Sequence, residues 1–184
     1  MRRIAFALLA GVIATPVAAQ EHRELGAHEH GRGTFNMAIE GSKVTMELEV
    51  PGADIVGFEH AAKSRRDKAA VEKAKVQLMA PLALFRLPAP ADCRVTEANV
   101  EVEQGEHDHG KEAHADAKGE GHSEFHAQYA LECGSVSSVT SIEFAYFGVF
   151  AGAQKLEVNV VTPKGQSKFE ATRAKPSISL VGMM

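Results

Sequence analysis

Apolar and polar residues alternate with a period of two through much of the chain, a pattern typical of β-strands with one buried face. The alternating runs outside the centre of the chain are 33–39, 43–50, 139–147, 154–161, 167–172 and 177–181. The first two runs flank Gly41, and the runs 154–161 and 167–172 flank a Pro-Lys-Gly-Gln turn, so each pair predicts a β-hairpin. Most of the fold is therefore expected to be β-sheet.

One segment has helical periodicity, because its apolar residues recur on one face of a helix at Val71, Ala74 and Leu78. Ser64 is a suitable N-cap for this helix, and Pro81 marks its end. The apolar stretch 81–90 has no clear period and predicts irregular, buried chain. Counted together with two strands in the centre of the chain, which are described next, the pattern gives about seven strands and one main helix. It indicates a β-rich α+β fold, with antiparallel, sandwich-like sheets in a single domain.

Two further strands are predicted in the centre of the chain, over 93–103 and 123–133. If they pair as an antiparallel hairpin in which paired residue numbers sum to 226, Cys93 lies opposite Cys133. A disulfide can span that separation. We therefore expect the two cysteines to be bridged across the hairpin.

The segment 104–122 between these two strands contains no large apolar residue, so it cannot bury enough surface to offset the entropy of ordering. It is expected to form a flexible loop without a ligand. Its histidines are interleaved with aspartate and glutamate, and these side chains are ligands that borderline divalent metals accept. The loop histidines are His107, His109, His114 and His122. A solvated acidic linker with incidental histidines is the alternative interpretation.

Residues 1–19 have the features of a secretory signal peptide: Arg2 and Arg3, an apolar run, and small residues up to Ala19. Cleavage after Ala19 would leave a domain of residues 20–184, and loss of the two arginines would take the formal net charge from −4 to −6. Bridged cysteines suit such an exported protein, and a bacterial periplasm is the expected location. No basic patch favours nucleic-acid binding, and no later run predicts a membrane anchor.

The remaining histidines occur in three separate segments, as His28 and His30, His60, and His126. In extended chain, His28 and His30 would point to the same side. Each of these histidines alone is weak support for a metal site. Taken alone, His60 is better explained as a partly buried histidine that bonds a backbone carbonyl than as a ligand oriented by a carboxylate.

Several segments of this chain resemble the zinc-regulated periplasmic proteins of proteobacteria. The similar segments are Ala-His28-Glu-His30-Gly, the run from Pro51 to His60 ending in Gly-Phe-Glu-His, the insert followed by His122-Ser-Glu-Phe-His126, the strand closing on Cys133, and Val161-Thr-Pro-Lys-Gly-Gln166. The resemblance implies a zinc-binding accessory to high-affinity zinc import. Its expected partners are a zinc ABC transporter and the periplasmic solute-binding protein of that transporter.

A zinc site closed by protein usually has about four ligands. We therefore hypothesise a folded site made by His28, His30, His60 and His126, with Glu59 or Glu124 orienting the imidazoles without touching the metal. The loop histidines would collect zinc, and His122 could replace any one of the four. The sequence does not exclude Cu²⁺ or Ni²⁺, because both also bind imidazole.

Two other classes of protein remain open at this point. One is an exported zinc- or copper-dependent enzyme, such as a superoxide dismutase or a zinc hydrolase. No His-Glu-x-x-His or Gly-x-Ser-x-Gly motif supports it. The other is a structural or adhesive module whose histidines are incidental. A zinc-binding protein without enzymatic activity fits the residues best.

Overall fold

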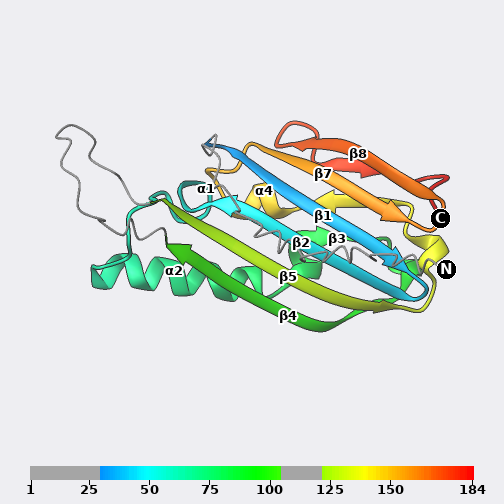
Figure 1. Cartoon of the computed structure of the whole chain (residues 1–184), viewed down its shortest axis with the longest axis horizontal. Helices are drawn as coiled ribbons and strands as arrows, with labels where there is room; N and C mark the ends of the chain where they lie inside the picture. Colours follow the sequence, from blue (N-terminus) through cyan, green and yellow to red (C-terminus); the bar gives the residue numbers. More distant parts are fainter. Residues whose placement is uncertain (1–29, 105–121) are drawn as a thin grey trace, which may run out of the picture.

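The predicted β-rich fold is confirmed by a computed structural model, which describes residues 30–104 and 122–184. A six-stranded sheet has the order β4-β5-β2-β1-β7-β8, and a three-stranded sheet has the order β3-β6-β9 (Figure 1). The large sheet contains β1 (Arg32–Glu40), β2 (Lys43–Pro51), β4 (Cys93–Gln104), β5 (Ser123–Cys133), β7 (Lys155–Thr162) and β8 (Gly165–Thr172). The small sheet contains β3 (Phe85–Arg86), β6 (Ser141–Phe144) and β9 (Ser177–Ser179).

The main helix is also confirmed. The helices of the described residues are α1 (Gly52–Val56), α2 (Arg65–Leu78), α3 (Pro81–Leu84) and α4 (Tyr146–Val149), with 3-10 turns at Ala89–Ala91 and Val136–Ser138. Ser64 caps α2, since its Oγ accepts a hydrogen bond of 3.0 Å from the Asp67 amide. At the other end of α2, Tyr129 donates a hydrogen bond of 2.9 Å to the Leu78 carbonyl, which ties the helix to β5.

Two local predictions are wrong. The stretch 81–90 is not irregular throughout, because it forms α3 and β3. The strand predicted over 139–147 is limited to β6, and α4 follows it. Tyr146, Phe147 and Phe150 are all buried. A helical turn directs these three side chains to one side, whereas a strand would send Phe147 to the opposite face.

Strand pairing confirms the two hairpins predicted near the ends of the chain, β1 with β2 and β7 with β8. The hairpins join through a parallel pairing of β1 with β7, which the sequence did not predict. Cys93 lies opposite Cys133 as expected, but a bulge between Val95 and Glu97 shifts the rest of the β4–β5 register by one residue. Gln104 therefore faces Ser123.

The core lies between the buried face of the large sheet and the layer formed by the small sheet and the helices (Figure 1). The ring centre of Phe35 on β1 is 4.6 Å from that of Phe85 on β3 and 5.3 Å from that of Phe144 on β6. Such aromatic contacts across the layers are typical of a sandwich. The opposite face of the large sheet carries most of its polar side chains.

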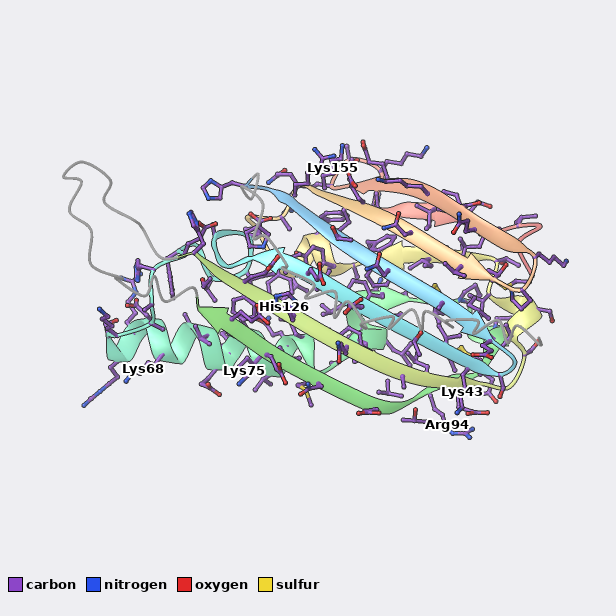
Figure 2. All side chains as sticks on the ribbon, in the orientation of Figure 1. Lys43, Lys68, Lys75, Arg94, His126 and Lys155 are labelled. Atoms are coloured by element: carbon purple, nitrogen blue, oxygen red, sulfur yellow. A yellow bond between two sulfur atoms is a disulfide. The ribbon has the colours of Figure 1, made fainter. Side chains whose placement is uncertain are left out.

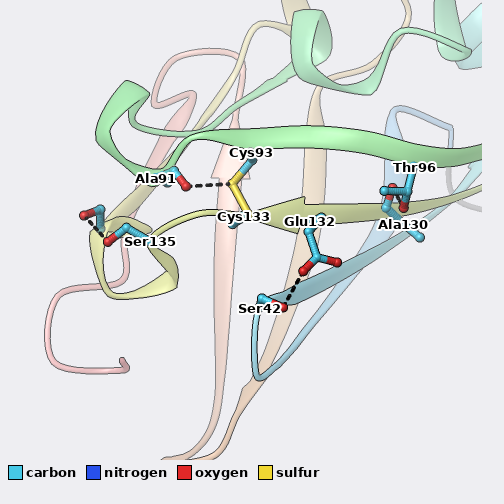
Figure 3. The surroundings of a disulfide bond; sticks show 9 residues. Ser42, Ala91, Cys93, Thr96, Ala130, Glu132, Cys133 and Ser135 are labelled. Carbon is cyan, nitrogen blue, oxygen red and sulfur yellow. Dashed lines mark hydrogen bonds between the residues drawn. A yellow bond between two sulfur atoms is a disulfide. The ribbon is translucent and has the colours of Figure 1, made fainter.

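The two ends of the large sheet differ. At one end, here called the disulfide end, the bond between Cys93 and Cys133 joins β4 to β5 with an S–S distance of 2.04 Å (Figure 3). The other end is formed by the starts of β1 and β5 and by the ends of β2 and β4, and we call it the histidine end. Residues 105–121 connect Gln104 to His122 at the histidine end.

Candidate metal site

All the described histidines belong to segments at the histidine end. His30 directly precedes β1, and His122 directly precedes β5. His60 follows α1, and His126 lies within β5 near its start. His28, His107, His109 and His114 lie outside the described residues, as do the predicted leader and most of the predicted loop.

Glu59 brings two of these segments together. One of its carboxylate oxygens, Oε2, lies 2.7 Å from Nδ1 of His122, and the other, Oε1, lies 2.9 Å from Nε2 of His30. The Glu59 side chain is 13% exposed, whereas the His30 and His122 side chains are 68% and 57% exposed. One largely buried carboxylate therefore meets two imidazoles at the surface.

The contact between Glu59 and His30 is close but lacks the geometry of a hydrogen bond. Oε1 of Glu59 consequently has no hydrogen-bond partner among the described residues, although it is buried. Burying a polar oxygen without such a partner is unfavourable. This oxygen is therefore available to accept a proton donor or a cation.

Asp54 in α1 lies beneath this contact and is 3% exposed. Its Oδ1 accepts a hydrogen bond of 2.7 Å from the amide of Gly31, and its Oδ2 has no hydrogen-bond partner within the described residues. Burial raises the pKa of Asp54 above its usual 3.8, the Gly31 amide and His30 oppose the rise, and Glu59 adds to it. Asp54 thus holds the backbone next to His30, and its pKa responds to the charges of His30 and Glu59.

His126 lies in a second group of different composition, on the polar face of the large sheet (Figure 2). Its Nε2 is 3.1 Å from Glu124 Oε2 and 3.6 Å from Glu103 Oε2, and its Nδ1 is 3.8 Å from Glu49 Oε1. Strand pairing explains this arrangement. It places His126 of β5 opposite Glu49 of β2, and Glu124 of β5 opposite Glu103 of β4. The His126 side chain is 16% exposed.

His60 is exposed, so the expectation of a partly buried histidine is wrong. Its ring stacks on Phe58, with ring centres 4.7 Å apart. Its Nδ1 lies 3.2 Å from the Ala61 carbonyl oxygen, as one of the two interpretations expected. These contacts of His60 are all within its own segment.

The predicted orienting carboxylates both touch histidines: Glu59 contacts His30 and His122, and Glu124 contacts His126. His30, Glu59 and His122 form one group, and His126 forms the other. Within residues 30–104 and 122–184, no group of three or more His, Cys, Asp or Glu side chains is arranged to hold a metal ion as it stands. The four-histidine site therefore stays a prediction.

Sequence reasoning missed three acidic residues that contact or support these histidines, namely Asp54, Glu49 and Glu103. Glu49 and Glu103 occupy outward positions of alternating strands, but only the register with β5 places them beside His126. Asp54 follows Pro51-Gly-Ala, where a break in the strand was expected, and its sequence context gave no signal of burial.

No helix in the described part of the chain is long and apolar enough to cross a membrane.

A comparison with curated proteins finds no match. A protein-family model described as ZrgA family zinc uptake protein matches residues 27–180, which include both histidine groups and the insert. The family description is that of an uptake protein and not of an enzyme. The chain therefore belongs to the ZrgA family of zinc uptake proteins.

Proposed function

We propose that this protein is a periplasmic zinc-binding protein, which captures zinc and delivers it to, or buffers it for, a high-affinity zinc ABC import system. The observation that carries the proposal is the meeting of His30 and His122 on Glu59, with His122 directly after the histidine-rich segment 105–121 in the sequence. Membership of a zinc uptake family supports zinc as the cargo.

The chemistry of the side chains suits this role. Zinc accepts imidazole nitrogen and carboxylate oxygen, and no thiolate competes because both cysteines are bridged. The folded site would draw its ligands from His28, His30, His60 and His126. His107, His109 and His114 would bind zinc weakly in the insert and raise its local concentration near that site. Cu²⁺ and Ni²⁺ remain competitors, because imidazole binds both.

Export supports the periplasmic part of the proposal. The first 19 residues have the composition of a cleaved leader, and a disulfide is stable in an oxidising compartment. A protein in that compartment can meet the solute-binding protein of a zinc ABC transporter. Zinc would pass from one protein to the other by ligand exchange.

The first test is a chelator-competition zinc titration of the intact protein and of a variant with residues 105–121 replaced by a short Gly-Ser turn. This variant keeps Gln104 and His122. We expect the intact protein to bind several zinc ions and the variant to keep one tight site. If all tight binding disappears with the insert, the protein is a zinc buffer on an inert scaffold and the folded site does not exist.

A second test separates delivery from buffering. Zinc-loaded protein is mixed with the metal-free solute-binding protein of the transporter, and the transfer rate is measured against a small chelator of equal zinc affinity. Delivery by contact predicts faster transfer from the protein, with a rate that rises with acceptor concentration. Equal rates would mean that zinc dissociates freely first and that the protein only buffers it.

A further inference from the structure

Glu59 is in an unusual position for a residue that only orients histidines. It lies in the connection between α1 and α2 and contacts two histidines from segments on either side of it in sequence. A carboxylate that orients a metal-bound imidazole accepts a hydrogen bond from the ring nitrogen that faces away from the metal. Glu59 Oε2 forms such a hydrogen bond with Nδ1 of His122, at 2.7 Å. Oε1, by contrast, accepts no hydrogen bond from His30, although Nε2 of that ring is 2.9 Å away.

The contact between Glu59 and His30 agrees better with two ligands that share one ion. Two ligands of a tetrahedral zinc ion, with bonds of about 2.0 to 2.1 Å, stand about 3.3 Å apart, and the lone pair of each points at the ion and not at the other ligand. A nitrogen–oxygen contact of 2.9 Å without hydrogen-bond geometry is close to that arrangement. A buried oxygen without a hydrogen-bond partner is stabilised when a cation lies against it.

From these observations we infer that His30, Glu59 and His122 are the protein ligands of a divalent-cation site, with Glu59 bound directly to the metal. The inference rests on the proposed function but changes the ligands of its folded site: it keeps His30 and takes Glu59 and His122 in place of His28, His60 and His126. His30 would bind through Nε2, which faces the unpartnered Oε1 of Glu59. His122 would bind through Nδ1, where the metal would take the place of the proton in the hydrogen bond with Glu59 Oε2. The rings now contact opposite oxygens, so at least one of them has to turn when the ion binds. Their exposure leaves room for that rotation.

The fold holds the chain beside each ring while the rings stay exposed. Gly31, next to His30, is held by its hydrogen bond to the buried Asp54. Ser123, next to His122, is buried against Gly52, where an added Cβ would lie 2.1 Å from the Ser123 Oγ. Both anchors belong to α1 or contact it. The short helix therefore acts as a platform that places two exposed ligands beside Glu59.

Three protein ligands leave the fourth position of a tetrahedral ion open to water or to an incoming ligand. A site of this kind releases its metal more readily than a site closed by four protein ligands. An acceptor protein could enter the open position and take over the ion step by step. This property fits a protein that has to pass zinc on.

The test uses the intact protein labelled with ¹⁵N at histidine and titrated with one equivalent of ¹¹³Cd²⁺ as a zinc substitute. We expect ¹¹³Cd–¹⁵N coupling to Nε2 of His30 and to Nδ1 of His122. Zinc affinity is then measured for Glu59→Gln and, as a matched control with the same loss of charge, for Glu47→Gln on the polar face of β2. Glu59→Gln should lower affinity by more than about 100-fold, because losing a carboxylate that only orients ligands costs about 10- to 100-fold.

Each outcome decides the inference. Tight binding without coupling to His30 and His122 would overturn it and leave the proposed function standing with other ligands. An unchanged Co²⁺ absorption spectrum in Glu59→Gln would also overturn it, since Glu59 would then lie outside the metal's coordination sphere. Absence of tight binding by the intact protein would overturn both the inference and the proposed function. The cadmium spectrum needs no substitution, so it holds even if Glu59→Gln folds poorly.

Discussion

The two halves of the large sheet neutralise their carboxylates in different ways. In the half formed by β1, β7 and β8, Glu157 pairs with Arg32 and, at 2.9 Å, with Lys168, while Glu170 pairs with Lys155. In the half formed by β2, β4 and β5, the described ion pairs of Glu49, Glu103 and Glu124 are with His126. Figure 2 shows Lys43 and Arg94 at the end of the sheet opposite His126, Lys155 beyond β1, and Lys68 and Lys75 on α2. We call these the lysine half and the histidine half.

This difference separates carboxylates in permanent ion pairs from carboxylates that can exchange a proton for a metal ion. Lysine and arginine keep their charge across the physiological pH range, so their pairs with glutamate are permanent. Histidine carries a charge only under mildly acidic conditions and otherwise offers a lone pair to a metal. Carboxylates beside histidine can therefore exchange a proton for a metal ion. The same side chains on the lysine half have no such alternative.

The edge strand of the histidine half is held covalently, and removing that bond should have the largest effect on stability. The Cys93–Cys133 bond joins residues 40 positions apart. Replacing both cysteines by serine should lower the free energy of unfolding by about 4 kcal/mol, because the unfolded chain gains conformational entropy when a loop of that size is no longer closed. Urea unfolding measures the loss. Zinc affinity of the folded variant should stay within about threefold, because the disulfide lies at the far end of β5, and a larger loss would show that the two ends of the sheet are coupled.

Acidification should weaken zinc binding. Free imidazole titrates near pH 6.5 and binds metal only when neutral, so a site with two histidine ligands should lose about 100- to 1000-fold in affinity between pH 7 and pH 5. Chelator competition at several pH values measures this loss. The Lys–Glu and Arg–Glu pairs of the lysine half do not titrate over this range, so they do not contribute to the loss. Zinc affinity that is independent of pH would exclude histidine as the main ligand.

A substitution in α1 should disturb the histidine end alone. In Gly52→Ala the new Cβ would lie 2.1 Å from Ser123 Oγ and 2.8 Å from the Phe58 carbonyl oxygen, so one of these segments has to move. We expect a loss of about 1 to 3 kcal/mol in stability, together with a loss of zinc affinity, since the displaced residues neighbour His122 and Glu59. Gly148→Ala is the control, because nothing lies within 4 Å of its added Cβ. Equal behaviour of the two variants would contradict the role of α1 as a platform.

The lysine half was the easier half to predict from sequence, because local pattern determines most of it. The alternation in 154–161 and 167–172 predicted β7 and β8. In the histidine half, the same period of two predicted only the pairing of Cys93 with Cys133. The parallel pairing of β1 with β7 could not be predicted. It joins residues more than a hundred positions apart and depends on how two finished hairpins pack against one core.

The histidine end was harder to predict for a related reason. Glu59 was recognised as a carboxylate near a histidine, but its sequence neighbour His60 turns away to stack on Phe58. The histidines that it contacts come from the starts of two strands that are not adjacent in the sheet. Their meeting depends on α1, whose five residues have no helical period long enough to detect. Sequence could name the ligand types but could not decide which of them meet.

The smallest expected effect concerns an ion pair of the lysine half. Hydrogen bonds from Lys168 and Arg32 lower the pKa of Glu157 from its usual 4.5 to about 2, so the pair stabilises the fold above pH 4.5 and this contribution is lost as the pH falls toward 2. Lys168→Gln should raise the pKa of Glu157 toward 4.5, which a ¹³C carboxyl NMR titration would measure. Lys164→Gln, in the exposed turn between β7 and β8, should leave that pKa unchanged. Zinc affinity should be the same in both variants at neutral pH. If Lys168→Gln alters zinc binding beyond experimental error, the permanent pairs of the lysine half also tune the histidine half, and the division of roles between the two halves fails.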